Sequence, residues 1–227
     1  EVTIYSGKGF LGPERKIEIK KDNETETIQG KNVLLATGST PRTIEGFEID
    51  GKIVVTSDEF LSLDQIPDRV AVIGGGAIGC EFASLLNDLG SSVTLLESLD
   101  EILAGCDKDV STSLRRSFSK KGIDIQTGVK VEGHESDGQK TTLSWSKDGD
   151  VNQLEVDLVV VSVGRQPNGN SAGLQNTQIG IDEKGYVEVD ERLKTKEQGV
   201  WAAGDVINTP QLAHVGFAEG IFAVKEI

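Results

Sequence analysis

Three glycines, spaced Gly74-x-Gly76-x-x-Gly79, are the residues whose pattern most clearly indicates chemistry. They follow a short apolar run, Arg69 to Ile73, and precede a segment with helical apolar spacing. In such a turn the first glycine allows the tight bend, the second lets a pyrophosphate approach the backbone, and the third lets helix and strand pack closely. The helix N-terminus then attracts the phosphate charge. The pattern predicts a dinucleotide site; the alternative is a glycine turn that merely connects strand and helix.

Glu97 bears on which dinucleotide is bound. It stands 97 − 74 = 23 positions after Gly74, at the end of the next apolar run. A carboxylate there can bind the adenine-ribose hydroxyls and repels a 2′-phosphate. No Lys or Arg follows until Lys108, so the cationic clamp for an extra phosphate is missing. The sequence favours NAD over NADP; the alternative is a solvated glutamate at a strand end.

The roles of two side chains beside the glycines stay open. Glu81, in the first turns of the expected helix, is either a partner of the helix dipole or a cofactor contact. Cys80 has no base or second cysteine near it in sequence, which favours a buried structural thiol. The other cysteine is Cys106, and the two form neither a C-x-x-C motif nor a metal-like cluster. We therefore expect no metal site, no disulfide framework and a reducing, cytoplasmic compartment.

Two other apolar runs end in small residues, L-L-A-T-G-S at 34–39 and G-V-W-A-A-G-D at 199–205. Small residues at a strand end let a ligand or a second backbone come close. Asp205 could position ribose or ribityl hydroxyls, or it could cap the next segment. The first run also matches 159–167 when 33–41 is shifted by 159 − 33 = 126 residues. Either coincidence or two related nucleotide-binding halves would explain this weak repeat.

The elements that would position these residues alternate between strand and helix from residue 68 onward. We expect strands at 69–73, 92–97, 123–125 and 157–163, and helices at 77–89 and 107–121 that stop at Gly90 and Gly122. Short alternating segments over 129–156, with turns at 136–138 and 148–150, predict an antiparallel meander. The fold class is therefore α/β, a Rossmann-type doubly wound parallel sheet with an antiparallel meander.

Two smaller predictions concern the first 60 residues. Thr56-x-x-Glu59 has the form of a capping box that opens a short helix. Glu1 to Tyr5 alternates like part of a strand and lacks the basic start and apolar centre of a signal peptide.

Composition excludes several classes of function. The chain has 227 residues, 37% of them hydrophobic, which is enough for a globular core. Its 23 basic and 37 acidic side chains give a net charge of −14, which disfavours nucleic acid and anionic membrane surfaces. No apolar run approaches the roughly 20 residues that span a bilayer. Since methionine is absent, we expect the chain to be cut from a longer protein or processed.

Taken in order, the motifs resemble the pyridine nucleotide-disulfide oxidoreductase family, and within it the dihydrolipoyl dehydrogenases. The resemblance spans essentially the whole chain and rests on A-T-G-S at 36–39, G-G-G-A-I-G-C-E at 74–81, V-G-R-Q-P-N at 163–168, A-A-G-D at 202–205, and L-A-H at 212–214 followed by Glu219-Gly220. In this family an NAD domain is inserted into a FAD domain. The resemblance thus implies the end of a first FAD segment at 1–43, an NAD-binding domain at 44–166 and the start of a second FAD segment at 167–227.

Roles carried over by matching position divide between the two cofactors. The resemblance implies NAD contacts at Gly74, Gly75, Gly76, Ala77, Ile78, Gly79, Cys80, Glu81, Glu97, Val129 and Gly164. It implies FAD contacts at Gly7, Thr37, Gly38, Ser39, Asp205, Gln211, Leu212, Ala213 and His214. His214 would then contact the flavin site through its backbone and would not act as a general base. No catalytic acid, base or nucleophile is assigned in the chain.

The chain also departs from the family pattern. The family begins with another G-x-G-x-x-G and a C-x-x-x-x-C redox pair, and it ends with a dimerisation domain that carries a catalytic His-Glu pair. None of these is in the sequence, so we expect them upstream and downstream of it. For the intact protein the resemblance implies a homodimer that oxidises dihydrolipoyl groups of 2-oxo acid dehydrogenase complexes through a disulfide and FAD to reduce NAD. The isolated chain would be inactive.

Two alternatives to that activity remain open. One is another flavoprotein reductase of the same fold, of the mercuric reductase or NADH oxidase type, which the missing cysteine segment would discriminate. The other is a non-catalytic NAD-binding module.

Overall fold

The computed structural model describes residues 1–136, 138 and 140–227, which divide into two compact units. Unit 1 combines residues 1–40 and 166–227, and unit 2 is the continuous segment 41–165. The chain passes from one unit to the other within β5 (Ser39–Pro41) and β14 (Arg165–Pro167), two short strands that pair with each other. The assignment of cofactors to 1–43, 44–166 and 167–227 stays a prediction.

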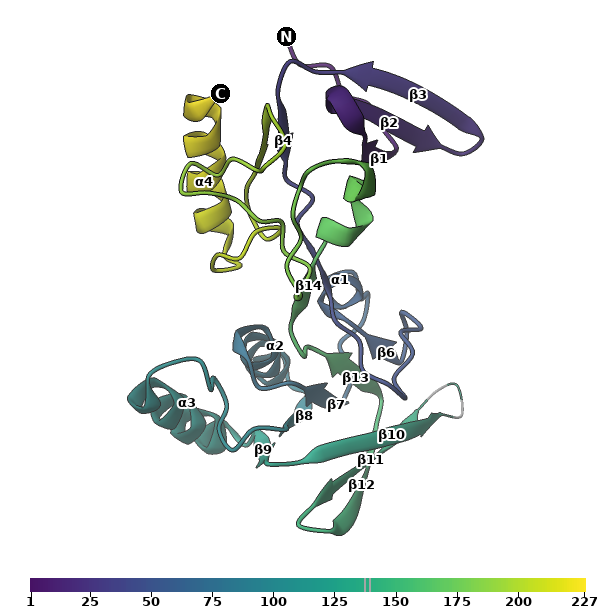
Figure 1. The fold of residues 1–227 in the computed structure, drawn as a ribbon. Coiled ribbons are helices and arrows are strands. Elements are labelled where there is room, and N and C mark those ends of the chain that lie inside the picture. Colours follow the sequence, from purple (N-terminus) through teal and green to yellow (C-terminus); the bar gives the residue numbers. More distant parts are fainter. Residues whose placement is uncertain (137, 139) are drawn as a thin grey trace. The chain divides into compact units, whose positions relative to one another are not determined.

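Unit 2 is built on a five-stranded sheet in the order β6-β13-β7-β8-β9, in which all neighbours are parallel (Figure 1). The strands are β6 (Val54–Val55), β13 (Leu158–Val161), β7 (Arg69–Ile73), β8 (Ser92–Glu97) and β9 (Asp124–Thr127). The helices are α1 (Ser57–Phe60), α2 (Ala77–Asp88) and α3 (Lys108–Lys121). The predicted α/β fold with a parallel sheet is confirmed.

The two faces of this sheet are covered differently. Along β7, Val70 and Val72 belong to one apolar cluster with side chains of α1, α2 and α3, whereas Ala71 and Ile73 belong to another with Leu143 and Val156 of the meander. Since side chains alternate along a strand, these clusters lie on opposite faces. Both are buried, which explains why the strand sequences are continuously apolar.

The meander is a separate antiparallel sheet of β10 (Lys130–Ser136), β11 (Thr141–Lys147) and β12 (Asp150–Val156). It covers the face where a doubly wound sheet ordinarily carries helices, and Figure 1 shows it opposite α2 and α3. Asp148 and Gly149 have positive φ, as a tight hairpin turn requires, so the turn predicted at 148–150 is confirmed. Of the turn predicted at 136–138, Asp137 lies outside the described residues.

Local signals fix the helix ends of unit 2. Thr56 and Glu59 form the predicted capping box at α1. Asp107, expected inside a helix, instead accepts the Asp109 N–H as the cap of α3. Gly122 ends α3 with a φ of 86°, and Ile123 donates its N–H to Phe118. Because that bond belongs to the helix end, β9 begins one residue later than predicted.

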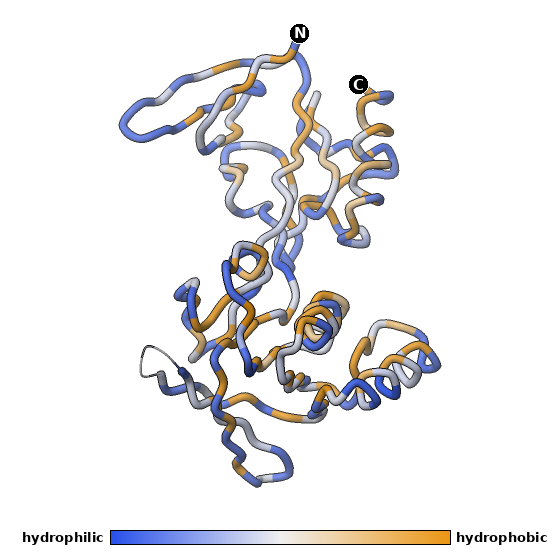
Figure 2. Tube along the Cα trace, turned by 180° about the vertical axis from the view of Figure 1, so that it is seen from behind, coloured by the Kyte–Doolittle hydropathy of each residue, from blue (hydrophilic) through white to orange (hydrophobic). Residues whose placement is uncertain are grey.

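Unit 1 holds an antiparallel sheet of β1 (Lys8–Leu11), β2 (Lys16–Lys21) and β3 (Glu24–Gln29). The tip joining β2 and β3 is hydrophilic (Figure 2). A parallel pair, β4 (Val33–Leu35) and β15 (Val200–Ala202), packs into a core with Leu11, Leu174 and Ile207. The final helix is α4 (Ala213–Glu226), and the 3-10 turns are Pro13–Arg15, Gly169–Ser171 and Leu174–Asn176.

The prediction that Glu1 to Tyr5 lies within a strand is wrong. The segment is outside regular secondary structure, and Val2 and Ile4 are 87% and 84% exposed. An alternating sequence becomes a strand only where a neighbour supplies hydrogen bonds, and among the described residues no strand pairs with this segment.

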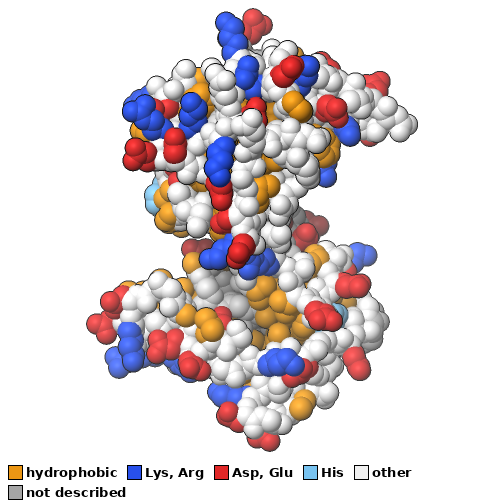
Figure 3. Space-filling view, in the orientation of Figure 1, with side chains coloured by type: hydrophobic (Ala, Val, Ile, Leu, Met, Phe, Trp, Pro, Cys, Tyr) orange, Lys and Arg blue, Asp and Glu red, His pale blue; other side chains and the backbone are white. Residues whose placement is uncertain are grey.

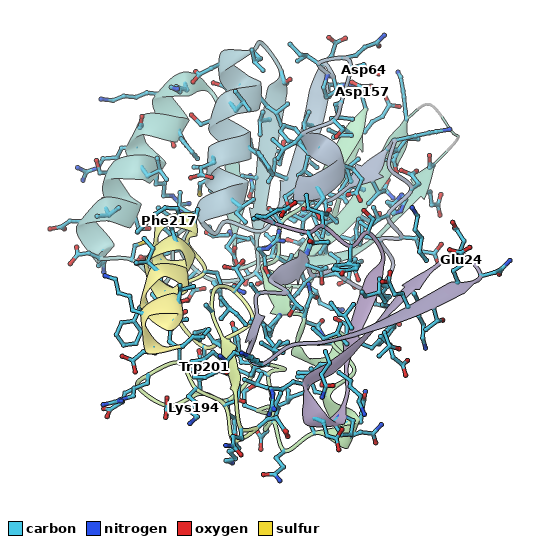
Figure 4. All side chains as sticks on the ribbon, turned by 90° about the horizontal axis from the view of Figure 1, so that it is seen from above. Glu24, Asp64, Asp157, Lys194, Trp201 and Phe217 are labelled. Carbon is cyan, nitrogen blue, oxygen red and sulfur yellow. The ribbon has the colours of Figure 1, made fainter. Side chains whose placement is uncertain are left out.

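The surface carries acidic and basic side chains interspersed over the face seen in Figure 3. Figure 4 labels Lys194 beside Trp201 in unit 1, where the ammonium lies 5.8 Å from the ring centroid. It also labels Phe217 of α4, one of several apolar side chains that this helix leaves exposed. Within the described residues, no helix has both the length and the apolar character needed to cross a bilayer.

Candidate functional site

The predicted nucleotide residues of unit 2 gather at one edge of its sheet. Because the five strands are parallel, all their carboxyl ends meet at this edge. Gly74 follows β7, Glu97 ends β8, Val129 follows β9 and Gly164 follows β13. The strand order of the sheet reverses at β7: β8, the next strand along the chain, lies on one side of β7, and β13 lies on the other side. In open α/β sheets, ligands bind at such a point of reversal.

The three motif glycines meet different constraints. Gly74 has a φ of +109°, and a Cβ on it would overlap the Ser162 carbonyl group. A Cβ on Gly79 would overlap the Gly74 carbonyl oxygen and stand 2.7 Å from Ser162 Oγ. A Cβ on Gly76 would meet open space, and Gly76 is exposed. The first and third glycines are therefore required by packing, whereas the second leaves a free approach to the backbone.

The turn is held by hydrogen bonds from three neighbouring segments. Gly74 donates its N–H to the Leu96 carbonyl at 2.8 Å, and Gly75 donates its N–H to the Glu97 carboxylate. The Gly75 carbonyl accepts the Leu103 N–H at 2.7 Å. Leu103, in the loop before α3, has a φ of 52°, a backbone conformation that costs a non-glycine residue free energy. The peptide groups of Gly74 and Gly75 are thereby fixed.

Glu97 does more than the sequence suggested. One carboxylate oxygen accepts the Gly75 N–H, and the other accepts the Leu99 N–H at 2.8 Å and the Ser98 hydroxyl at 3.1 Å. The side chain is half-buried beside the glycine turn. A carboxylate can accept about four hydrogen bonds and three are used here, so this arrangement leaves capacity for about one ligand hydroxyl.

The start of α2 is open. Gly76 caps the helix in extended conformation, and in the described part of the chain no side chain caps it. Ala77 is exposed and Ile78 is half-buried. The first N–H groups of a helix lack intrahelical partners and attract anions. Glu81 is exposed one turn further on, and its two possible roles stay open.

Cys80 is buried, and its thiol lies 3.4 Å from the Gly75 carbonyl oxygen. Burial raises the pKa of this thiol to about 11, with nearby Glu97 adding to the shift. A thiol with so high a pKa is a poor nucleophile near neutral pH, which fits a structural role. Cys106 is exposed. Within the described ranges there is no group of three His, Cys, Asp or Glu side chains that could hold a metal.

Val129 and Gly164 could serve a ligand mainly through their backbone. The Val129 side chain is buried in the core, and its N–H donates to the Glu97 carbonyl at 3.1 Å. Gly164 is exposed with a φ of +105°, and its carbonyl accepts the Arg42 N–H at 2.9 Å.

In unit 1, the ends of β4 and β15 bring four predicted flavin residues together. The Ser39 hydroxyl donates to the Asp205 carboxylate at 2.7 Å. Asn168 donates its backbone N–H to the Gly38 carbonyl and its side-chain amide to the Thr37 carbonyl, both at 2.9 Å. The segment Thr37 to Ser39 is thus held in place beside Asp205.

The remaining predicted flavin residues lie at the start of α4 and before β1. Leu212, Ala213 and His214 are exposed, whereas Gln211 Nε2 is buried with no hydrogen-bond partner among the described residues. A buried donor without a partner costs free energy, so an acceptor at this place would be stabilising. The contacts of Gly7 are with β2, where a Cβ would stand 2.8 Å from Ile19.

Three residues that shape these strand ends were not predicted from the sequence. They are Ser162, whose hydroxyl donates to the Ile73 carbonyl; Asn168; and Glu219, whose carboxylate accepts the Gly204 N–H at 2.7 Å. Asn168 and Glu219 lie in segments that carried the family resemblance, and Ser162 directly precedes one of them. A polar residue next to a buried strand end or helix was the only available signal.

Known proteins are similar to this chain over nearly its whole length. The family model described as pyridine nucleotide-disulphide oxidoreductase matches residues 4–220. A dihydrolipoyl dehydrogenase of Bacillus subtilis is 39% identical over 236 residues, covering 99% of this chain and 50% of that protein. A mitochondrial dihydrolipoyl dehydrogenase of Caenorhabditis elegans is 40% identical, covering 96% and 45%. The chain spans about half the length of these relatives.

Solved structures show the same similarity. The HOCl-induced flavoprotein disulfide reductase RclA of Escherichia coli, in a Cu(II) complex, matches with a TM-score of 0.88 and 27% identity, over 97% of this chain and 49% of that one. LpdA of Mycobacterium tuberculosis matches with a TM-score of 0.85 and 28% identity, over 96% and 47%.

Proposed function

This chain belongs to the pyridine nucleotide-disulphide oxidoreductase family, and from that premise we propose that its unit 2 binds NAD(H). In the intact protein, unit 1 contributes to a FAD site, and the enzyme is a homodimer of the dihydrolipoyl dehydrogenase type. It oxidises dihydrolipoyl groups of 2-oxo acid dehydrogenase complexes and reduces NAD. The relatives at 39% and 40% identity support this substrate class.

One observation carries the NAD proposal: the Glu97 carboxylate is held against the Gly75 N–H, directly beside the uncapped start of α2. The helix start suits the pyrophosphate, and the carboxylate suits the ribose hydroxyls. Both lie at the carboxyl edge of one parallel sheet. A 2′-phosphate would meet the negative charge of Glu97, so NADP is disfavoured.

The flavin side is supported by the arrangement of unit 1. Asp205 stands at the end of β15 beside the Thr37 to Ser39 segment, and Gln211 Nε2 offers an unpaired donor in the described chain. FAD would supply the electron transfer between thiol and nicotinamide. This chain's residues would bind and orient the two cofactors.

Calorimetric titration with NADH and NADPH tests the NAD proposal. We expect NADH to bind at least tenfold more tightly, and Glu97→Ala to bring the two affinities close together, because one carboxylate hydrogen bond and one repulsion are lost.

Glu97→Ala also removes an acceptor from Gly75 and Leu99, so circular dichroism must confirm that the variant is folded. Glu101→Ala, which removes an equal charge at an exposed position in the same loop, is the control and should keep the preference. Equal or tighter NADPH binding by the unaltered chain would refute the proposal.

A second expectation concerns the chain by itself. Cys80 is buried with a raised pKa and Cys106 is exposed, so neither is suited to act with the other as a redox pair. We expect no NADH formation from dihydrolipoamide, even with added FAD and NAD. Turnover that disappears when both cysteines are changed to serine would contradict this assignment.

A further inference from the structure

Ser162, the residue after β13, makes unusually many contacts with the glycine turn. Its Oγ lies 3.0 Å from the Ile73 carbonyl oxygen and 3.3 Å from the Gly74 carbonyl oxygen, and its N–H donates to the Ile73 carbonyl at 2.8 Å. Its own carbonyl faces Gly74 so closely that only a glycine fits there. We propose that Ser162 is a positioning residue that holds the glycine turn in the conformation that binds the pyrophosphate. This inference rests on the NAD(H) proposal.

Hydrogen bonds from neighbouring segments hold the peptide groups of the glycine turn. Gly74 N–H is bound by Leu96 of β8, Gly75 N–H by Glu97, and Gly75 carbonyl by Leu103. The Ser162 hydroxyl has one hydrogen and lies within hydrogen-bond distance of two successive carbonyl oxygens that precede the open helix start, Ile73 at 3.0 Å and Gly74 at 3.3 Å. Removing this hydroxyl would leave the Ile73 carbonyl with the Ser162 N–H, but it would take from the Gly74 carbonyl the donor that the two share.

The electrostatic consequence concerns the bound phosphate. A carbonyl oxygen carries a partial negative charge, so a Gly74 carbonyl that turned away from Ser162 could weaken phosphate binding. The same hydroxyl lies where a side chain on Gly79 would have to stand, so Ser162 also packs against the first turn of α2. One residue of the neighbouring strand thereby restrains both the turn and the helix that follows it.

A matched control exists at the opposite edge of the same sheet. Ser91, just before β8, is buried and donates its hydroxyl to the Pro67 carbonyl at 2.6 Å. It has the same side chain and the same kind of bond, and its bond partner lies at the amino ends of the strands. Ser91→Ala therefore measures the general cost of losing one serine hydrogen bond in unit 2.

The experiment compares the unaltered chain with Ser162→Ala, Ser162→Thr and Ser91→Ala. Calorimetry gives the affinities for NADH, NADPH and ADP-ribose, and amide hydrogen exchange of the free chain gives the local stability of residues 74–79. For Ser162→Ala we expect about fivefold to tenfold weaker binding of NADH and of ADP-ribose, since both contain the pyrophosphate. The preference for NADH over NADPH should not change, because Glu97 is intact. Amide hydrogen exchange should become faster at residues 74–79. Because threonine also carries a hydroxyl, Ser162→Thr should restore both the NADH affinity and the slow exchange.

Three results would overturn the inference. One is Ser162→Ala binding NADH as tightly as the unaltered chain does. Another is unchanged exchange at residues 74–79. The third is an equal loss of affinity in Ser91→Ala, which would show that the effect is general destabilisation. If the unaltered chain binds no NADH, the NAD(H) proposal itself fails, and the exchange data of the free chain still decide whether Ser162 holds the turn.

Discussion

The glycine turn of unit 2 and the A-G-D turn of unit 1 are both strand ends made of small residues, yet they are stabilised differently. The strand before the glycine turn, β7, has parallel neighbours on both sides and is buried on both faces. The strand before the A-G-D turn, β15, has three residues and one parallel partner, β4. Around Gly74 and Gly79 the packing leaves no room for a Cβ, whereas at Gly38 and Gly204 a Cβ meets nothing within 4 Å.

The two turns therefore differ in what fixes their conformation: steric exclusion in unit 2 and polar contacts in unit 1. In unit 2, contacts of the backbone with itself define the turn, and Glu97 and Ser162 complete it. In unit 1, distant polar residues hold the loops: Asn168 holds Thr37 through its side chain and Gly38 through its backbone N–H, and the Glu219 side chain holds Gly204. Substitutions should therefore cause large, local steric failures in the first turn and graded losses in the second.

Gly79→Ala should have the largest effect. The added methyl group would overlap the Gly74 carbonyl oxygen, a backbone atom that cannot rotate away, and would crowd Ser162. We expect unit 2 to lose about 3 kcal/mol of its free energy of unfolding, since overpacking against backbone forces α2 away from the sheet. Urea unfolding followed by Trp145 fluorescence, in a Trp201→Phe background, measures unit 2 alone.

Gly76→Val is the control for that experiment. A side chain here meets open space, so unit 2 should unfold at nearly the same urea concentration as the unaltered chain. NADH binding should nevertheless be lost, because the side chain would occupy the approach to the pyrophosphate. If Gly76→Val bound NADH normally, the phosphate would have to be held elsewhere.

Glu219→Ala should have an intermediate effect, confined to unit 1. It leaves the Gly204 N–H without its acceptor, which should cost about 1–2 kcal/mol. Fluorescence of Trp201 in a Trp145→Phe background follows the unfolding of this unit. Glu219→Gln retains a carbonyl oxygen as acceptor and should recover most of the loss. An equal effect of the two substitutions would show that the charge of Glu219 is what matters.

The contrast between the units also explains how far the sequence could be read. The glycine spacing, the strand β8 and the capping box are local signals, and each predicted its structure correctly. The role of Ser162 depends on the closeness of β13 to β7, and that of Glu219 on α4 reaching Gly204. Such pairings join residues 15 to 89 positions apart, and no local pattern specifies them.

The strand predicted at Glu1 to Tyr5 failed for a related reason. Its alternation is a local property, whereas a strand needs hydrogen bonds from a neighbouring segment. Glu97 shows the opposite case. Its position at a strand end predicted a carboxylate for ribose hydroxyls or a solvated glutamate, but the bonds to Gly75 and Leu99 became visible only once the turn and loop were folded around it.

The smallest effect concerns the buried thiol of Cys80 behind the glycine turn. Burial raises its folded-state pKa to about 11 from an ordinary value of 9.0, so between those pH values the folded chain keeps a proton that the unfolded chain releases. The unfolding free energy of unit 2 should therefore be unaffected by this thiol below pH 9 and fall by about 2 kcal/mol as the pH rises to 11.

Other groups titrate in the same range, so the measurement is the difference in urea unfolding between the unaltered chain and Cys80→Ala at pH 8 and at pH 11. Cys106→Ala removes an exposed thiol and should keep the full pH dependence. The same pH dependence in Cys80→Ala would show that the Cys80 thiol is not held protonated by the fold, and the structural role given to it beside Gly75 would then be wrong.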